Sequence, residues 1–317
     1  RRMMYEHGIL KSLHPGIPVI SIGNLTLGGT GKSPTTIKIA NFIHGKGKRV
    51  AVVSRGYRRK SKGFVLVRDG NEILATVEDS GDEAQMLAEA LPFAIIIVDE
   101  DRVHGAHQAK NLGADVVLLD DGYQHLRIQR DLNILLVDAS INKGNVIPFG
   151  RLREPINASR ATDIILVVEE SDDKIWRDLD RFLRPNTLKA KLRASPVALE
   201  AIGNAPPLDL SDLSGRCIIA VSSIANPHRF YDMLRALGSD VIERDLGDHA
   251  EYTAAIVTTI LRDSDAANAD FIVTTAKDGV KSRQYFEHSN EKIYILKHDL
   301  EFLSGERSFY QAIDRIL

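Results

Sequence analysis

Several residue types and patterns are scarce in this sequence, and each scarcity excludes a class of protein. The 317 residues include one cysteine, Cys217, which cannot form an internal disulfide, so the sequence indicates a reducing compartment. Cys217 lies in an apolar run and is expected to be a small buried core residue. No apolar run approaches the roughly 20 residues that span a bilayer, and no signal peptide is visible. The 41 basic and 43 acidic side chains nearly cancel, which argues against general nucleic-acid binding.

The sequence does contain a stretch typical of phosphate-binding loops, Thr26-Leu27-Gly28-Gly29-Thr30-Gly31-Lys32-Ser33. It follows an apolar run and precedes a predicted helix over 34–44, the order in which backbone N–H groups surround nucleotide phosphates. Lys32 is expected to reach the β- and γ-phosphates, and the Ser33 hydroxyl to ligate Mg²⁺. Thr26 stands where such loops usually have glycine. The alternative is a glycine-rich turn with a solvated lysine, which the flanking segments disfavour.

Apolar runs alternate with helical patterns through the first half of the chain. Most are continuously apolar, as expected for parallel strands that helices cover on both faces. Residues 63–76 instead resemble an inserted hairpin that turns at Asp69-Gly70-Asn71. We therefore predict a doubly wound α/β domain of the P-loop NTPase type with a mostly parallel sheet. Its expected strands are Pro18–Gly23, Arg49–Arg55, Phe93–Asp99, Asp115–Asp121, Leu132–Asp138 and Asp163–Glu169.

A proline-bearing stretch separates the two halves, and a second α/β series follows it. We expect a nucleotide-binding domain over 1–186 and a smaller α/β domain over 187–303. Segments 188–194 and 292–300 are expected to be paired hinge strands, and a helix over 304–317 is expected to pack back on the first domain. The second series is expected to hold the strands Cys217–Ser222, Asp240–Arg244, Phe271–Thr275 and Ile293–Leu296, and the helices Arg229–Leu237 and Tyr252–Leu261.

Two pairs of adjacent carboxylates, Asp120 with Asp121 and Asp82 with Glu83, lie at positions where catalytic or metal-binding groups are expected. Asp120 and Asp121 end an apolar strand, so they should emerge beside the phosphate loop, where one of them can hold Mg²⁺. The alternative is that they cap a turn. Asp82 begins a helical pattern, and a carboxylate at that end of a helix stays ionised and can accept a proton. A capping box between Ser80 and Glu83 would explain the same segment structurally.

Basic residues and histidines also allow two interpretations. Residues 55–60 carry four cations, which form either a solvated loop or an edge that binds anions. Arg102 and Arg153 follow other apolar segments and are expected at the same edge. His249 precedes a helix of the second half, where a lone histidine is more often a satisfied loop residue than a catalytic one. Five further histidines have no evident partners and are assigned to the surface or to packing: His7, His14, His44, His104 and His107.

A set of longer stretches, in order from about residue 18 to residue 280, carries a more specific resemblance. The chain resembles the tetraacyldisaccharide 4′-kinase family, the lipid A kinases of Gram-negative bacteria, whose phosphate loop also lacks the leading glycine. Asp-Asp-Gly-Tyr-Gln-His and Leu-Arg-Glu-Pro are far more specific than a phosphate loop alone. The matching stretches are residues 23–34, Ser54-Arg55-Gly56-Tyr57, Gly81-Asp82-Glu83, Asp120-Asp121-Gly122-Tyr123-Gln124-His125, Leu152-Arg153-Glu154-Pro155, Asp248-His249 and Thr275-Ala276-Lys277-Asp278.

The resemblance implies transfer of the γ-phosphoryl group of ATP to the 4′-hydroxyl of a tetraacylated glucosamine disaccharide 1-phosphate, with ATP and Mg²⁺ as cofactors. The family's catalytic positions match Asp82, which would act with His249 across a cleft between the domains, together with Lys32 and Arg153. The positions near the magnesium ion match Ser33, Glu83, Asp120, Asp121 and Glu154. The nucleotide-binding positions match residues 26–33, Arg102, Gln124 and His125.

The resemblance also implies a protein at the cytoplasmic face of the inner membrane, peripheral or monotopic. An anionic membrane surface is the expected partner, with no nucleic acid and no obligate protein partner. The family's N-terminal apolar helix dips into that membrane, and only its basic end is expected here, so this chain can also be soluble. Residues 1–14 mix basic and apolar side chains, as in a surface-seeking amphipathic helix or a helix packed on its own domain.

Two other functions compete with a lipid kinase. The first is a P-loop GTPase or regulatory ATPase. Its guanine-recognition motif, [NT]-K-x-D, is approached only by Thr275-Ala276-Lys277-Asp278, which has the wrong spacing. The second is a nucleotide-binding module without lipid kinase activity, whose second domain recruits a protein.

Overall fold

A computed structural model describes residues 2–139, 141, 144–168, 174–286 and 292–317. The chain forms two compact units, one of residues 1–194 with 300–317 and the other of residues 195–299. Arg1, in the expected N-terminal helix, and Glu169, at the end of an expected strand, lie outside the described residues.

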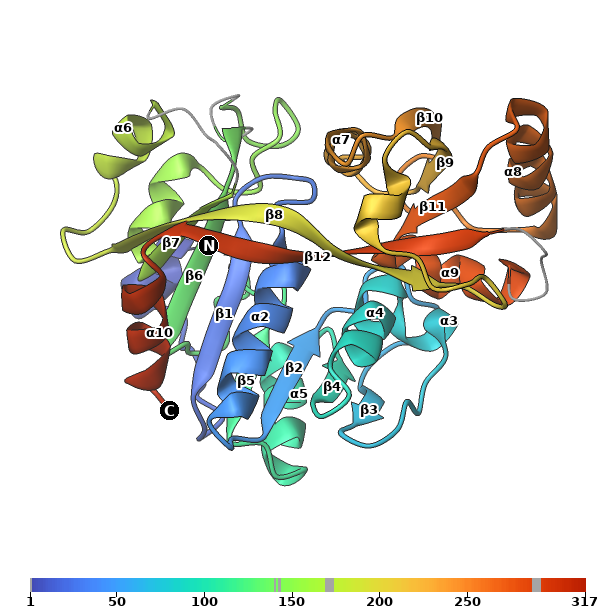
Figure 1. The fold of residues 1–317 in the computed structure, drawn as a ribbon. Helices are drawn as coiled ribbons and strands as arrows, with labels where there is room; N and C mark the ends of the chain where they lie inside the picture. Colours follow the sequence, from blue (N-terminus) through green and yellow to red (C-terminus); the bar gives the residue numbers. More distant parts are fainter. Residues whose placement is uncertain (1, 140, 142–143, 169–173, 287–291) are drawn as a thin grey trace. The chain divides into compact units, whose positions relative to one another are not determined.

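The first unit is built on a mostly parallel sheet (Figure 1). Its strand order is β8-β7-β6-β1-β5-β2-β4-β3, in which only β3 runs antiparallel to its neighbour. The chain winds outward from β1 in both directions, so the predicted doubly wound α/β fold is confirmed. The strands are β1 (Val19–Asn24), β2 (Val50–Ser54), β3 (Val65–Asp69), β4 (Ile95–Val98), β5 (Val116–Leu119), β6 (Leu132–Val137), β7 (Ile164–Val168) and the first half of β8 (Leu188–Ala201).

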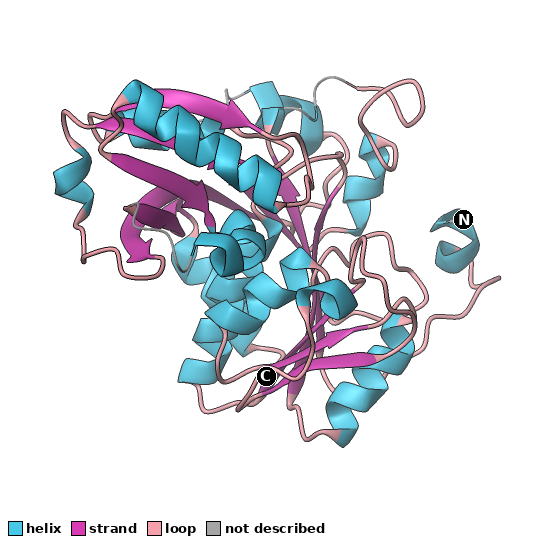
Figure 2. Ribbon diagram, turned by 90° about the vertical axis from the view of Figure 1, so that its right-hand side faces the viewer, coloured by secondary structure: helices cyan, strands magenta, loops and turns pink. Residues whose placement is uncertain are grey.

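Helices cover both faces of these strands (Figure 2). Alternate side chains of β2 show the two faces: Val50 and Val52 pack in one core with α2 and α4, and Ala51 and Val53 pack in a second core with α5. Because both faces are buried, the strands read as continuous apolar runs. The helices are α1 (Arg2–Glu6), α2 (Lys32–Gly45), α3 (Val77–Ser80), α4 (Asp82–Ala90), α5 (Arg102–Asn111), α6 (Lys174–Asp180) and α10 (Glu306–Asp314), with a 3₁₀ helix over Ile156–Ala161.

Residues 63–76 turn back at the expected place, and the two arms form a short antiparallel hairpin. The Asp69 carboxylate accepts two backbone N–H groups of the turn, at 2.8 and 3.0 Å. The arms are joined by a bridge between Arg68 and Ile73 and by a 2.8 Å hydrogen bond from Leu74 N–H to the Val67 carbonyl. β3 also pairs with β4 at the edge of the main sheet, because its buried Val67 joins the core there.

The second unit contains a parallel sheet in the order β10-β9-β11-β12. Two clusters of apolar side chains on its two faces form its core. Cys217 is half-buried, not fully buried as expected, because it begins β9 at the edge of this core. The elements are a 3₁₀ helix over Leu210–Leu213, β9 (Cys217–Ser222), α7 (His228–Ala236), β10 (Asp240–Asp245), α8 (Ala254–Ala267), β11 (Phe271–Thr275), α9 (Ala276–Phe286) and β12 (Ile293–Ser304). Strands β8 and β12 are neighbours, and each has residues in both units.

The C-terminal helix α10 returns to the first unit. Its residues Phe309, Ala312 and Ile313 are buried in the same core as α2. Gly305 precedes the helix with a φ of 82°, and a Cβ there would lie 2.6 Å from the Lys189 carbonyl oxygen of β8. The close approach of α10 to β8 therefore requires glycine at this position.

The N-terminal segment leaves its apolar side chains in solvent. None of the residues of α1 is buried, and Met3 and Ile9 are both 68% exposed. These apolar side chains fit the surface-seeking alternative, whereas the ion pair of Arg2 with Glu154 fits a helix packed on its own domain, so the segment has features of both. Among the described residues, the structure has no helix with the length and apolar character that a membrane span requires.

Candidate phosphate-binding and catalytic site

The phosphate-loop segment joins the end of β1 to the start of α2. Gly28 and Gly31 have φ angles of 118° and 85°, a backbone conformation that side chains rarely allow. The loop is braced from outside, since Leu27 N–H donates to the Arg151 carbonyl at 2.8 Å and Arg153 N–H donates to the Leu25 carbonyl at 2.7 Å. These bonds fix the loop before the amino end of α2, where the helix dipole favours anions.

Lys32 lies against the carboxyl edge of the sheet, as the phosphate-loop interpretation requires. Its Nζ is 3.4 Å from Asn24 Oδ1 and 3.7 Å from Asp121 Oδ1. Asp121 also forms an ion pair with Arg153, with a shortest N–O distance of 2.6 Å. Burial opposes ionisation of Asp121 most strongly, but Lys32 and Arg153 together hold its pKa below the ordinary value. The carboxylate of Asp121 thus lies between Lys32 and Arg153, two cations of the kind that bind phosphate.

Asp120 has the opposite environment. It is buried, and its Oδ1 accepts a 3.0 Å hydrogen bond from the Thr36 hydroxyl. Burial, reinforced by the charges of Glu83 and Asp121, raises its pKa to about 7. Its Oδ2 is buried and accepts no hydrogen bond from the residues that the structure describes.

The unsatisfied Oδ2 of Asp120 indicates whether the carboxyl edge of the sheet suits a metal ion. A buried carboxylate oxygen without a donor is a ligand that a hard divalent cation would satisfy. Over the described ranges, however, no group of three or more His, Cys, Asp or Glu side chains could hold an ion by itself. The donors therefore fit Mg²⁺ only in its usual nucleotide form, with one or two carboxylates and the remaining sites filled by phosphate oxygens and water.

The capping box between Ser80 and Glu83, the structural alternative for this segment, is not formed. Ser80 ends α3, and its hydroxyl donates to the Thr76 carbonyl at 2.7 Å. α4 begins after Gly81, which provides no side-chain cap. Asp82 is therefore the first residue of α4, is 8% exposed, and accepts the Glu83 N–H on Oδ1 at 3.0 Å. Glu83 lies near enough to Asp120 to raise its pKa, so the start of α4 faces the same edge.

The expected basic residues divide into two groups. Arg102 is buried, and burial lowers its pKa to about 10, although Asp121 and Asp120 oppose that shift. It therefore belongs to the edge beside the phosphate loop, with Arg55 as a neighbouring charge. Arg59 instead holds the chain locally, through a 2.8 Å ion pair with Glu100.

Other expected positions lie on the loop after β5. Gln124 donates from Nε2 to the Asn24 carbonyl at 2.7 Å, which ties that loop to the end of β1. His125, next to it, is half-buried.

Glu154, which lies between β6 and β7, forms a 2.5 Å ion pair with Arg2, and the Arg2 guanidinium also covers the Tyr123 ring. Glu154 is thus engaged by the N-terminal segment, whereas Glu83, Lys32 and Asp121 are the charged neighbours that act on Asp120.

His249 belongs to the second unit, on the loop between β10 and α8. Its Nε2 lies 3.2 Å from Lys277 Nζ, and its N–H donates to the Ser223 carbonyl at 3.0 Å. The sequence placed Lys277 and Asn24 in stretches that carry the family resemblance but assigned neither a role, and it did not single out Thr36. Thr36 stands four residues after Lys32 on α2, and that helical spacing was the one available signal.

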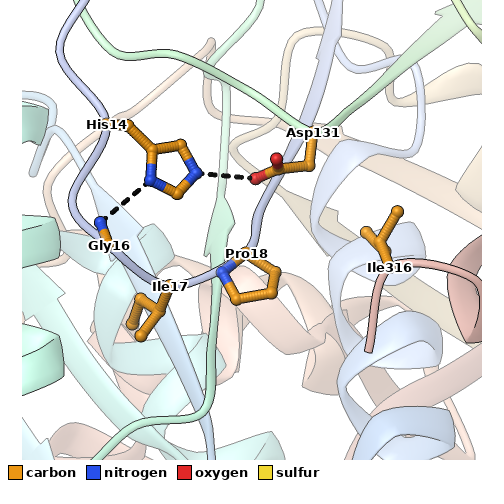
Figure 3. A pocket seen from close by; sticks show the side chains of 6 residues that line it. All are labelled: His14, Gly16, Ile17, Pro18, Asp131 and Ile316. Atoms are coloured by element: carbon orange, nitrogen blue, oxygen red, sulfur yellow. Dashed lines mark hydrogen bonds and ion pairs between the residues drawn. The ribbon is translucent and has the colours of Figure 1, made fainter.

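A cavity of about 290 Å³ lies at the other end of β1 (Figure 3). It is lined by His14, Gly16, Ile17, Pro18, Asp131 and Ile316. His14 is 3.2 Å from Asp131, which also accepts the Val19 N–H at 2.8 Å, so both groups serve to anchor the chain before β1. His14 was expected to lack a partner. The same expectation was wrong for His104, which lies 2.6 Å from Asp99.

Comparisons with known proteins identify the family of this chain. The sequence profile of the tetraacyldisaccharide-1-P 4′-kinase family (LpxK) matches residues 1–317. The tetraacyldisaccharide 4′-kinase of Pelobacter propionicus is 37% identical, over 95% of this chain and 83% of that protein. That of Geobacter sulfurreducens is 39% identical, over 89% and 79%. A crystal structure of LpxK from Aquifex aeolicus in complex with ATP matches with a TM-score of 0.79 at 30% identity, over 100% of this chain and 93% of that one. This chain therefore belongs to the tetraacyldisaccharide-1-P 4′-kinase family.

Proposed function

We propose that this protein is an ATP-dependent kinase that phosphorylates the 4′-hydroxyl of tetraacyldisaccharide 1-phosphate in lipid A biosynthesis. Membership of the family supports the activity. The observation that carries the proposal is the contact set around Lys32, whose ammonium lies 3.7 Å from Asp121 at the carboxyl edge of the sheet. An ammonium, a guanidinium and buried carboxylates at one edge are the parts that phosphoryl transfer needs.

The phosphate loop would bind ATP. Backbone N–H groups of residues 28–33 would surround the phosphates, and Lys32 would leave Asp121 to contact the β- and γ-phosphate oxygens. Arg153 and Arg102 would face the charge that spreads over the γ-phosphoryl oxygens. The neighbouring carboxylates hold both guanidiniums beside the loop before phosphate enters, and Arg153 would exchange Asp121 for phosphate oxygens.

Mg²⁺ is the cofactor that this edge fits, with the Ser33 hydroxyl and Asp120 as the first candidates to hold it. A bound Mg²⁺ would neutralise charge on the β- and γ-phosphates. Asp120 must lose its proton to serve as a ligand, and its raised pKa makes that step dependent on pH. Glu83 and Asp121 would act through water or through their charge. Glu154, paired with Arg2, would join only if that ion pair opened.

Asp82 would act as the general base. The 4′-hydroxyl oxygen would attack the γ-phosphorus, its proton would pass to Asp82, and the bond to the β,γ-bridging oxygen would break to release ADP. The amino end of α4 and the Glu83 N–H favour the charged carboxylate before the attack. His249 would contribute to the same reaction from the second unit.

The acceptor would be a lipid that stays in, or close to, a membrane surface. The exposed apolar side chains of the N-terminal segment, such as Met3 and Ile9, support a peripheral attachment to the cytoplasmic face of the inner membrane. Lys11, an exposed basic residue of the segment, would contact the anionic surface. Nucleic acid and an obligate protein partner have no part in this proposal.

Incubation of the purified protein with γ-labelled ATP, Mg²⁺ and tetraacyldisaccharide 1-phosphate tests the function. We expect label in the lipid at the 4′-position, and none in the deacylated disaccharide or in simple glucosamine. Lys32→Met serves as the inactive control. Release of phosphate from ATP without labelled lipid would instead support an ATPase. Binding of ATP without any turnover would support a nucleotide-binding module.

A further inference from the structure

His249 is held in an uncommon backbone conformation. Its φ of 59° lies in the left-handed region, which residues with a side chain rarely adopt. Its side chain is only 11% exposed. Such a conformation persists where the surrounding structure imposes it, so the neighbours of His249 in the second unit identify what holds it.

The backbone of the His249 loop is anchored on the start of α9. His249 N–H donates to the Ser223 carbonyl at 3.0 Å, and Lys281 Nζ donates to the Ala250 carbonyl at 3.2 Å. Ser223 is held in turn by the fully buried Asp278, which accepts its N–H at 2.9 Å and also its hydroxyl. The backbone of this loop is therefore held in place by bonds that do not involve the His249 ring.

The ring of His249 is contacted by Lys277, at 3.2 Å from Nζ to Nε2. Lys277 and Lys281 stand one turn apart and share a face of α9. Lys281 lies 3.2 Å from Asp278 in an ion pair, whereas Lys277 faces the imidazole. The Asp248 carboxylate is 3.8 Å from the same ring nitrogen, which is beyond hydrogen-bond distance.

The chemistry of the two groups decides which nitrogen carries the proton. A lysine ammonium can only donate, so the ring nitrogen that faces it must accept. Nε2 is then unprotonated and the ring proton lies on Nδ1. We propose that Lys277 is a positioning residue that fixes His249 as the Nδ1-protonated tautomer. The consequence for catalysis rests on the proposed function, in which His249 takes part in phosphoryl transfer.

This role accounts for a motif that the sequence left without a function. Thr275-Ala276-Lys277-Asp278 has the wrong spacing for guanine recognition. In the structure Thr275 Oγ1 and Asp278 Oδ2 are 2.7 Å apart across the first turn of α9. Asp278 fixes the Ser223 loop and Lys277 orients the histidine, so the motif supports His249 through both its backbone and its ring.

The test compares Lys277→Met, which removes the donor and keeps an apolar stem, with Lys277→Arg, which keeps a donor. Arg262→Gln, an exposed charge on α8, is the control for loss of one positive charge in the same unit. We expect Lys277→Met to lower kcat about 10- to 100-fold, by analogy with the loss of a group that orients a metal-ligating histidine. The KM for ATP should stay within about twofold, because Lys32 and its loop are untouched. Lys277→Arg should recover most of kcat.

A second measurement reads the tautomer directly. Side-chain ¹⁵N signals of His249, assigned by their loss in His249→Gln, are recorded at about pH 8, where an ordinary histidine is neutral. We expect Nδ1 to be protonated in the wild type, and a mixture of tautomers in a folded Lys277→Met. A protonated Nε2 in the wild type would overturn the proposal, as would a Lys277→Met variant with unchanged signals and unchanged kcat. These signals do not depend on lipid phosphorylation, so failure of the kinase proposal would be recognised separately by absent transfer in the wild type.

Discussion

At the scale of single residues, neighbouring carboxylates acquire opposite properties from their surroundings. Asp120 is enclosed by apolar strands and other acids, and its pKa rises to about 7. Asp121 is the next residue, yet the cations Lys32 and Arg153 lower its pKa. The sequence placed both at the end of a strand beside the loop. The sequence could not assign them different environments, because those depend on contacts with residues far away in the chain, such as Lys32 and Arg153.

The raised pKa of Asp120 predicts a pH-dependent stability. Its pKa is about 7 in the folded protein against an ordinary 3.8, so the folded state binds the extra proton between these values. Stability without ligand should therefore fall as pH rises from about 4 to about 7, and level off above that. Asp120→Asn has no carboxyl group to ionise at this position and so escapes this loss of stability. The difference in free energy of unfolding between Asp120→Asn and the wild type should therefore grow in favour of the variant, by about 1.4 kcal/mol per pH unit where the change is steepest.

Urea unfolding of both proteins at several pH values measures this difference. Asp232→Asn, which changes an exposed carboxylate on α7, should show no such growth. A difference between Asp120→Asn and the wild type that stays constant with pH would contradict the burial argument. Saturating Mg²⁺ and ATP should also stabilise the wild type more at high pH, because the metal competes with the proton.

Asp82 should be required for transfer but not for nucleotide binding. We expect Asp82→Asn to lower single-turnover transfer by about 100- to 10,000-fold, because an amide cannot accept the hydroxyl proton. The Kd for ATP should remain within about threefold, since the phosphate loop is unchanged. Glu78→Gln, an exposed neutralisation on the adjacent α3, is the matched control. Full transfer by Asp82→Asn would remove it from the mechanism.

At the scale of elements, helix ends and strand pairings depend on neighbours that local patterns do not show. Asp82 begins α4 as the helical pattern indicated, but Ser80 belongs to a separate turn of helix and caps nothing. The sequence indicated that β3 is one arm of a hairpin. In the structure β3 is also the edge strand of the main sheet, because pairing with β4 buries its apolar side chains in the core. Local propensity predicted where elements begin, and tertiary packing decided their partners.

The junction between β12 and α10 should tolerate no side chain. Gly305→Ala places a Cβ 2.6 Å from the Lys189 carbonyl oxygen at a left-handed φ, so we expect a loss of about 2 to 4 kcal/mol in the free energy of unfolding. Gly45→Ala, at the end of α2, meets no atom within 4 Å and should change that free energy by less than about 1 kcal/mol. Chemical denaturation measures both. Equal effects would show that α10 does not pack tightly on β8.

At the scale of the whole molecule, two units have separate apolar cores. ATP would bind the first of them, and binding to the folded state alone stabilises that state by mass action. The single tryptophan, Trp176, lies in α6 of the first unit and reports on its unfolding. Fluorescence can therefore follow the ligand-binding unit without an added label.

ATP with Mg²⁺ should raise the unfolding midpoint seen by Trp176. At 100 times the Kd, the expected gain is about 2.7 kcal/mol. Lys32→Met should lose most of this gain, while Lys62→Met, an exposed lysine of the same unit, should keep it. An equal gain in all three proteins would place the nucleotide outside the phosphate loop.

The sequence by itself determined the fold class and the location of the candidate phosphate site, because apolar runs of the right length form buried parallel strands whose carboxyl ends meet at one edge. Residues that follow those strands, such as Lys32 and Asp120, are brought together by that rule alone. The tertiary structure decided the pairings across long separations: Arg2 with Glu154, Lys277 with His249, and the cations around Asp121. Such contacts depend on how loops are packed, and an ionisable group takes its charge state from all of its neighbours in space rather than from those in the chain.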